Sequence, residues 1–206
     1  GADLQGVLAL RTADDAERLK HALGPGKRLD VIGGGYIGLE VAASARALGA
    51  EVFVIERESR LLARVACSSL SEFFLDYHRG QGVTFALGAQ VAGIQGEGGK
   101  VKALCFHNGD PIACDVVLVG VGAMPNEELA VAAGIDCADG VLVDETARTS
   151  LDGVWAIGDC TRRPLPLYGE GVMRRMESVP SALEQAKQVA ADLTGHAPPP
   201  PEVPWF

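Results

Sequence analysis

The chain alternates between short apolar runs, which are typical of buried strands, and wider repeats of apolar residues, which are typical of amphipathic helices. The short runs are residues 29–32, 51–56 and 82–85. The repeats between them predict two helices, whose expected inward faces are Ile37, Val41, Ala45 and Leu48 in the first and Leu70, Phe73, Phe74 and Tyr77 in the second. We therefore predict a βαβαβ unit with a parallel sheet.

The pattern then changes to paired runs that are joined by tight turns. Residues 89–94 and 100–106 flank the glycine-rich stretch 96–99, and an Asn-Gly turn follows at 108–109. Such turns connect antiparallel neighbours, so we expect a β-meander here. Residues 115–119 are again mainly apolar, which predicts a return to the parallel sheet.

A second block of the chain contains a strand signal and a helix signal. We expect an apolar strand over residues 151–159, ending in Gly158-Asp159. An aspartate just past a strand end can accept hydrogen bonds from a polyol. Pro180 suits the first position of the helix that follows. The expected inward face of this helix is Leu183, Ala186, Ala190 and Leu193.

Weaker signals mark the boundary between the blocks and the end of the chain. Asn126 is expected to cap a short helix, and residues 140–143 to start another strand. The proline-rich stretch 197–201 predicts a stiff linker before the terminal Trp-Phe pair. We expect two domains, residues 1–124 and 125–206.

The composition narrows the class of protein. Of the 206 residues, 48% are apolar, which is enough for a well-filled core. The formal net charge of −9 argues against nucleic acid or an anionic membrane as a partner. No apolar run reaches the ~18 residues of a membrane-spanning helix, and no leader pattern opens the chain, so we expect a cytoplasmic location.

Neither the cysteines nor the histidines form a metal-binding pattern. The five cysteines lie far apart without CxxC spacing, and we expect them to be small buried hydrophobes. For Cys160, which follows Asp159, packing is preferred over chemistry. The four histidines are scattered, and we expect His78 to be solvated on its helix. We predict no metal site.

The strongest local motif is a turn with three glycines between the first strand and the first helix. In this turn Gly33 allows a tight bend, Gly35 lets the backbone approach a pyrophosphate, and Gly38 lets the helix pack closely on the strand. The helix N-terminus then points free amides at the phosphates. The alternative is a plain strand-turn-helix corner without a ligand.

The next strand ends in an acid, Glu56, roughly 20 residues after the turn. At this position a carboxylate accepts hydrogen bonds from the ribose of an adenine nucleotide. The glycine turn and Glu56 together predict a dinucleotide site at the carboxyl edge of the sheet.

Six ordered motifs extend along nearly the whole chain, at residues 31–40, 60–64, 70–79, 120–126, 156–160 and 177–186. Together they resemble the FAD-dependent pyridine nucleotide-disulfide oxidoreductase family, whose members have two dinucleotide folds, and within it the NADH-dependent ferredoxin reductases. The resemblance implies an α/β fold with a Rossmann-like parallel sheet and a β-meander crossover, plus a partial second domain. By this resemblance, residues 1–124 are an NAD(P)-binding domain and residues 125–206 are the C-terminal half of an FAD-binding domain.

The resemblance implies where NADH lies. The nucleotide would cross Gly33, Gly35 and Gly38, with its adenine ribose at Glu56. Arg64 would also bind the cofactor. The nicotinamide end would lie near Tyr36, Ile37, Glu40, Gly120, Val121 and Gly122. By resemblance, Tyr36 and Glu40 face the flavin, where Tyr36 covers the nicotinamide pocket and Glu40 contacts the carboxamide. The alternatives are a packing role for Tyr36 and a solvated carboxylate for Glu40.

The resemblance also implies an FAD site in the second block. Gly158 and Asp159 match the turn that bonds the ribityl chain, and Ser178 and Val179 match the segment whose backbone meets the flavin ring. The helix that starts near Pro180 would place its positive N-terminal end by the flavin, which raises the reduction potential.

The choice between NADH and NADPH depends on Glu56. Two unit charges ~4 Å apart interact by about 4 kcal/mol at an effective dielectric of ~20, so Glu56 would repel a 2′-phosphate by more than a tenfold difference in affinity. We therefore predict a preference for NADH. The alternative is that Arg57 or Arg60 swings round and neutralises the phosphate.

The implied activity is hydride transfer from NADH to FAD, followed by single-electron transfer to a ferredoxin-type 2Fe–2S protein. No side chain then has to act as acid, base or nucleophile. Arg162-Arg163 and Arg174-Arg175 are expected to steer an acidic ferredoxin, with a solvated face as the alternative. The resemblance allows a homodimer of a full-length parent.

Two other interpretations stay open. A disulfide or peroxide reductase has the same fold, and a nucleotide-binding module or inactive fragment would bind without catalysis. The family has a first glycine motif for FAD before the NAD domain and a further domain at its end, and we expect this chain to be the central fragment between them.

Overall fold

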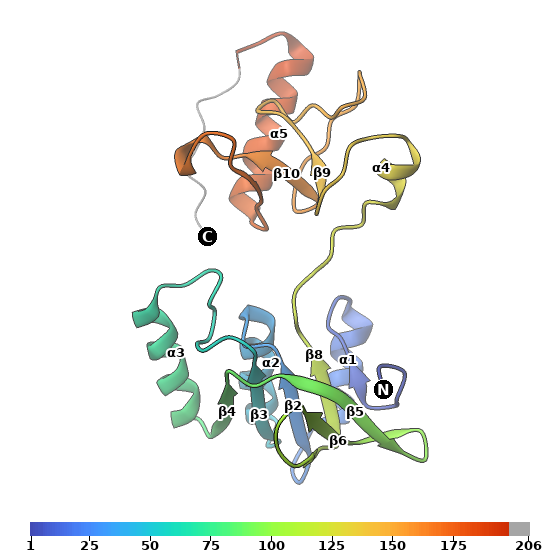
Figure 1. Cartoon of the computed structure of the whole chain (residues 1–206), viewed down its shortest axis with the longest axis vertical. Coiled ribbons are helices and arrows are strands. Elements are labelled where there is room, and N and C mark those ends of the chain that lie inside the picture. The colour runs from blue at the N-terminus through green and yellow to red at the C-terminus, as the bar shows by residue number, and fades with distance from the viewer. Residues whose placement is uncertain (198–206) are drawn as a thin grey trace. The chain divides into compact units, whose positions relative to one another are not determined.

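The structure is a computed structural model that describes residues 1–197 and divides into two compact units, Gly1–Gly122 and a second unit that begins at Ala123 (Figure 1). The prolines expected to form a linker and the final Trp-Phe pair lie outside the described residues. The elements of the first unit are β1 (Val7–Leu8), α1 (Ala13–Ala22), β2 (Arg28–Ile32), α2 (Tyr36–Ala47), β3 (Glu51–Glu56), α3 (Ser68–Gly80), β4 (Val83–Leu87), β5 (Val91–Glu97), β6 (Lys100–Phe106), β7 (Ile112–Ala113) and β8 (Val116–Val119). The elements of the second unit are α4 (Glu128–Ala132), β9 (Val141–Leu142), β10 (Thr161–Pro164), the 3₁₀ turn η1 (Pro166–Tyr168), β11 (Met173–Arg175) and α5 (Val179–Thr194).

The first unit is built on a five-stranded parallel sheet with the strand order β1-β8-β2-β3-β4. The predicted βαβαβ unit is β2-α2-β3-α3-β4, and β8 returns beside β2 as expected. The meander β5-β6-β7 is antiparallel, with Gly98 and Gly99 in left-handed conformations at its first turn. The Rossmann-like α/β fold class is confirmed. Strand β1, which is two residues long, was not predicted.

The two faces of this sheet are buried by different partners. Alternate residues of the strands, such as Leu29, Val31 and Val54, pack with Val41 and Ala45 of α2. The opposite alternation packs against the meander, in a second cluster that contains Ile32, Ile55, Val101, Leu104 and Val117. Because strand side chains point alternately to the two faces, β1, β2, β3 and β8 each contribute to both clusters.

The expected inward face of α3 is wrong in three of its four residues. Leu70, Phe73 and Tyr77 are exposed, whereas Phe74 is partly buried. The helix packs instead through Phe74, Leu75 and the buried imidazole of His78, which meets Phe85 edge-on. The expectation that His78 is solvated is therefore also wrong, and burial lowers the pKa of this imidazole. The outward rings of Phe73 and Tyr77 stack on each other instead.

The exposure of α2 also differs from the prediction at its ends. Val41 and Ala45 are buried as expected, but Ile37 and Leu48 are exposed. The buried face begins with Gly38 and Leu39, because the close approach of Gly38 to β2 rotates Ile37 outward. Gly49 follows the helix with a φ of +87°, as a closing glycine should.

The second unit has a three-stranded sheet, β11-β10-β9, with β9 and β10 parallel and β10 and β11 antiparallel. The strand expected over 151–159 is wrong, since Trp155 makes only an isolated bridge to Arg148 and the strand of this region is β10. Asn126 is not the cap of α4, because the cap position is Glu127.

Helix α5 buries a polar face where an apolar one was expected. Its buried residues are Ser181, Glu184, Gln185 and Gln188, whereas Leu183 and Leu193 are 56% and 62% exposed. The reason is its partner β10, whose inward residues Thr161 and Arg163 are themselves polar and need hydrogen-bond partners.

No helix among residues 1–197 is long and apolar enough to cross a membrane. All five cysteines lie in this range with free thiols, but only Cys114 is buried. The expectation that all of them are buried is thus wrong, most clearly for the exposed Cys67.

Candidate functional site

The three glycines of the turn differ in what surrounds them. A Cβ on Gly33, whose φ is +114°, would lie 2.3 Å from the carbonyl oxygen of Gly120, and a Cβ on Gly38 would lie 2.1 Å from that of Gly33. Both are therefore required by the protein's own packing. A Cβ on Gly35 would meet no atom within 4 Å, and its φ of −85° is open to any residue. The space beside Gly35 is left open by the protein, as a backbone-approach site for a ligand requires.

Gly35 is also the N-cap of α2, and no side chain caps this helix. The first amides of the 12-residue helix therefore keep free donors at the carboxyl edge of the sheet. Helix N-termini of this kind attract phosphate through these donors and the helix dipole.

Glu56 is fixed at the same edge by the backbone of the glycine turn. Its Oε2 accepts from the amide of Gly34 at 2.7 Å, and its Oε1 accepts from the amide of Glu58 at 2.8 Å. Each carboxylate oxygen has a second lone pair, so both can still accept from hydroxyl groups. The structure thus places a half-buried carboxylate directly against the glycine turn.

The loop that leaves β8 completes this edge. The amide of Gly120 donates to the carbonyl of Ile32, and the Gly120 carbonyl lies against Gly33. Val121 is 70% exposed, and Tyr36 and Ile37 are 50% and 49% exposed. Glu40 is exposed as well. The side chains expected near the nicotinamide are therefore outside the core of the first unit, and the ring of Tyr36 is half exposed at the start of α2.

The three arginines after Glu56 have different surroundings. Arg57 is exposed and pairs with Glu58 at 3.3 Å. Arg60 is tied to three acceptors, the carbonyls of Ala63 and Ala66 in its own loop and the hydroxyl of Ser71 on α3. Arg64 is exposed, and its Nη2 lies 3.8 Å from where a Cβ of Gly122 would be. Only Arg57 and Arg64 are thus open to a nucleotide.

In the second unit, the turn that carries Asp159 is held by buried side chains that the sequence did not indicate. The amide of Gly158 donates to Oε1 of Gln185 at 2.7 Å, and its carbonyl accepts from the Thr161 hydroxyl at 2.8 Å. Nε2 of Gln185 donates to the same hydroxyl at 2.8 Å. Gly158 has a φ of +83°, and Asp159 is exposed beyond it.

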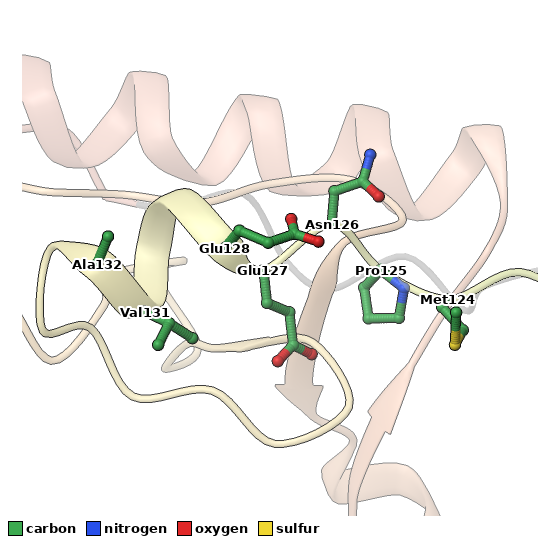
Figure 2. Close-up of a pocket in the computed structure, with 7 residues that line it drawn as sticks. All are labelled: Met124, Pro125, Asn126, Glu127, Glu128, Val131 and Ala132. Carbon is green, nitrogen blue, oxygen red and sulfur yellow. The ribbon is translucent and has the colours of Figure 1, made fainter.

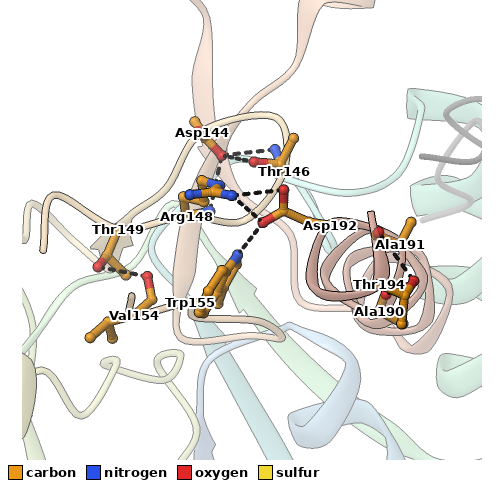
Figure 3. A network of polar contacts seen from close by, with 10 residues as sticks. All are labelled: Asp144, Thr146, Arg148, Thr149, Val154, Trp155, Ala190, Ala191, Asp192 and Thr194. Carbon is orange, nitrogen blue, oxygen red and sulfur yellow. Dashed lines mark hydrogen bonds and ion pairs between the residues drawn. The ribbon is translucent and has the colours of Figure 1, made fainter. Parts of the chain in front are cut away.

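A second network fastens the segment that leads to this turn (Figure 3). Asp192 of α5 accepts from the guanidinium of Arg148 at 2.9 Å and from the indole of Trp155 at 2.8 Å. These two hydrogen bonds lower the pKa of Asp192, with the Arg148 bond as the larger cause. The Arg148 guanidinium also lies over the Trp155 ring. Helix α5 therefore holds the segment 148–161 at two places, through Gln185 and through Asp192.

The start of α5 is exposed in part. Ser178 is the N-cap, and its hydroxyl accepts from the amide of Ser181 at 3.4 Å. Val179 is 72% exposed, and Pro180 is the second helical residue, one position later than expected. The first turn of this 16-residue helix thus presents backbone and an uncovered valine.

The two arginine pairs expected to face a partner protein are divided by the structure. Arg163 is buried and forms an ion pair with Glu184 at 2.9 Å, and the side chain of Arg175 is 12% exposed and pairs with Glu177. Arg162 is partly buried and donates to the Ala138 carbonyl. The expectation of four arginines on one interaction face is wrong, since only Arg174 is fully exposed.

A hollow of about 570 Å³ in the second unit contains none of the predicted site residues (Figure 2). Its lining residues are Met124, Pro125, Asn126, Glu127, Glu128, Val131 and Ala132. Glu127 already accepts a hydrogen bond from the amide of Gly140. The glycine turn is the better candidate site, because it combines free helix amides with a fixed carboxylate. Among the described residues, no group of three or more His, Cys, Asp or Glu could hold a metal ion.

Comparison with known proteins gives a family match. Residues 1–186 match the family model described as pyridine nucleotide-disulphide oxidoreductase. The chain is 50% identical to the probable ferredoxin reductase CtmF of Castellaniella defragrans, over 100% of this chain and 50% of that protein. It is 46% identical to terpredoxin reductase of a Pseudomonas species, over 94% of this chain and 47% of that protein.

A solved structure of similar fold is the covalent complex of putidaredoxin reductase with putidaredoxin. The TM-score is 0.92 at 40% identity, and the match covers 100% of this chain and 49% of that chain. This chain therefore spans about half the length of the curated relatives it matches.

Proposed function

The chain belongs to the pyridine nucleotide-disulphide oxidoreductase family, and on that premise we propose that it acts as part of an NADH-dependent ferredoxin reductase. In this proposal the first unit binds NADH and the second contributes half of an FAD site. When bound, the cofactors supply the chemistry, which is hydride transfer from nicotinamide to flavin followed by single-electron transfer to an iron–sulfur protein. The residues of this chain would bind and orient the two cofactors. The positive end of α5 would raise the reduction potential of the flavin.

The observation that carries the proposal is the open space at Gly35 between two glycines that the packing requires. Alanine at position 35 would meet no protein atom, so no steric contact within the protein excludes a larger residue there. A pyrophosphate that approaches the free amides of α2 does exclude one. We place its phosphates at Gly33, Gly35 and Gly38.

The remaining NADH contacts follow from the same edge. Glu56 presents free lone pairs to the adenine ribose, and Arg64 reaches toward Gly122 over the expected path of the nucleotide. Tyr36, Ile37, Glu40, Gly120, Val121 and Gly122 are assigned to the nicotinamide end. Exposure of the first three supports this assignment.

The flavin contacts are assigned to the second unit. Asp159 is exposed beyond the left-handed Gly158 and would bond the ribityl hydroxyls. The backbone at Ser178 and Val179, at the positive end of α5, would stabilise negative charge on the reduced flavin ring.

A ferredoxin-type 2Fe–2S protein is the proposed electron acceptor. The support is the names of the relatives, which include a ferredoxin reductase and a terpredoxin reductase, and the putidaredoxin bound in the similar structure. Of the arginines considered for steering, Arg174 alone keeps an exposed guanidinium for this role. A homodimer of the full-length protein and a cytoplasmic location remain proposals.

The preference for NADH over NADPH is tested by calorimetric titration of the chain with both nucleotides. We expect NADH to bind at least about tenfold more tightly, because Glu56 repels a 2′-phosphate. The E56Q variant keeps an oxygen for the Gly34 amide but removes the charge, so it should bring the two affinities closer. Equal affinities of the wild-type chain would contradict the proposal.

A nucleotide-binding module without catalysis is the second candidate, since the chain spans half of its relatives. Absorption spectra with added FAD separate the two. A flavin spectrum that bleaches on addition of NADH supports the reductase, whereas NADH binding without bound flavin supports a module.

A further inference from the structure

The loop between β3 and α3 is held by a cluster of hydrogen bonds behind the glycine turn. Nη1 of Arg60 donates to the Ala66 carbonyl at 2.6 Å and to the Ser71 hydroxyl at 2.9 Å, and Nη2 donates to the Ala63 carbonyl at 2.8 Å. The Ser71 hydroxyl in turn donates to the Leu61 carbonyl at 2.6 Å. We call Arg60 and Ser71 the loop clamp.

The loop requires such a clamp because its backbone is strained. Leu62 has a φ of +52°, a left-handed conformation that a leucine rarely adopts, and its side chain is 3% exposed. Strain of this kind persists only where the surroundings hold it in place. The carbonyls of Ala63 and Ala66, which Arg60 binds, belong to the turn immediately after Leu62.

The clamped loop lies directly on the glycine turn. The amide of Leu62 donates to the Gly34 carbonyl at 3.0 Å. A Cβ on Gly34 would lie 2.6 Å from a methyl carbon of Leu61, so the loop packs tightly onto this peptide. The same Gly34 donates its amide to Glu56. Arg64, which reaches toward Gly122, is carried by this loop.

We propose that Arg60 and Ser71 are positioning residues for NADH, which hold the Gly34 peptide, Glu56 and Arg64 in their binding geometry without touching the nucleotide. The inference rests on the proposed function of the glycine turn. Ser71 is 2% exposed and cannot reach a ligand, and the two terminal nitrogens of Arg60 both donate to protein acceptors. This replaces the alternative in which Arg60 neutralises the 2′-phosphate of NADPH.

The test is titration of the chain with NADH and NADPH for R60A, R60K, S71A and the double variant R60A/S71A, well below their measured unfolding midpoints. We expect R60A to weaken both nucleotides in parallel by about tenfold, as removal of a supporting contact does at other sites. S71A should weaken both in the same direction, and the double variant should be no weaker than R60A, because the two residues act as one unit. R60K should recover part of the loss.

The matched control is R79A, which removes an exposed arginine from the last turn of α3, the helix that carries Ser71, and should change the affinity for either nucleotide less than twofold. Wild-type affinity for NADH in R60A and S71A would overturn the clamp, as would a loss confined to NADPH or a fully additive double variant. A wild-type chain that binds neither nucleotide would instead overturn the proposed function, and the clamp with it. Loss of stability alone leaves the affinity of the folded chain unchanged, so it cannot imitate the expected result.

Discussion

The glycines of the turn in the first unit differ in whether the fold or a ligand explains them. Gly33 and Gly38 each face a carbonyl oxygen at a distance that excludes a Cβ, and Gly34 faces Leu61 and Glu56. Gly35 faces open space. One short turn therefore contains glycines that the fold needs and one glycine that a ligand explains.

Asp30 is a residue that the fold buries at a cost. It lies in the middle of β2 with no exposed surface, and Nε of Arg28 donates to its Oδ1 at 2.9 Å. Its Oδ2 has no hydrogen-bond partner. Burial raises the pKa of this carboxyl from 3.8 to about 6, although Arg28 opposes the shift. Asp30 is not part of the candidate site.

The raised pKa of Asp30 predicts how stability depends on pH. The folded state binds this proton more tightly than the unfolded state does, so the contribution of Asp30 is present below pH 4 and is lost as pH rises through about 6. Relative to D30N, the wild-type chain should therefore gain about 2 kcal/mol in free energy of unfolding when pH falls from 7.5 to 4. Urea unfolding at several pH values measures this difference.

The control for this prediction is D110N, which changes an exposed aspartate in a loop and should follow the wild-type curve. Parallel pH curves for wild type and D30N would show that the Asp30 carboxyl titrates alike in the folded and unfolded chain.

At the scale of elements, the polar face of α5 is the feature that organises the second unit. Glu184, Gln185 and Gln188 meet Thr161 and Arg163 of β10, and Gln185 reaches the Gly158 turn. Buried polar groups of this kind specify one arrangement only when all of them are satisfied. The position of Asp159 thus depends on a helix residue 26 places later in the chain, at position 185.

The Gln185 contacts predict a large loss of stability in Q185L. Leucine has a similar volume but leaves the Gly158 amide without its acceptor, which costs about 1–3 kcal/mol, and removes the donor to the Thr161 hydroxyl, which keeps only its bond to the Gly158 carbonyl. Urea unfolding of the chain followed by near-UV circular dichroism would detect this loss. The exposed L183A on the same helix should change stability by less than about 0.5 kcal/mol. Equal midpoints for Q185L and L183A would contradict the role of Gln185.

The elements also show which features of the fold can be predicted from the sequence. The βαβαβ unit and the meander follow from local patterns, because apolar periodicity and glycine turns are encoded within a few residues. The faces of α3 and α5 do not, since apolar side chains such as Phe73 and Leu183 are exposed while His78 and Gln185 are buried. Which face packs inward depends on the partner element, and β10 itself was not indicated by the sequence.

For the whole molecule, the residues of the candidate site are easier to predict from the sequence than the residues that hold them in place. The glycine turn and Glu56 are visible as a motif because each needs one residue type at one spacing. The loop clamp and the Gly158 contacts join residues far apart in the chain, and single side chains such as Ser71 and Gln185 give no signal by themselves. The net charge of −9 agrees with a partner other than nucleic acid.

The most direct test of this account is the NADH affinity of the G35A variant, measured by titration calorimetry together with its unfolding midpoint. Gly80 also has open space around it, so G80A is the matched control. We predict that G35A stays within about 1 kcal/mol of the wild type in free energy of unfolding, the size of an N-cap change, but binds NADH at least about tenfold more weakly, while G80A binds as the wild type does. Wild-type affinity in G35A would contradict the claim that the space beside Gly35 receives the nucleotide.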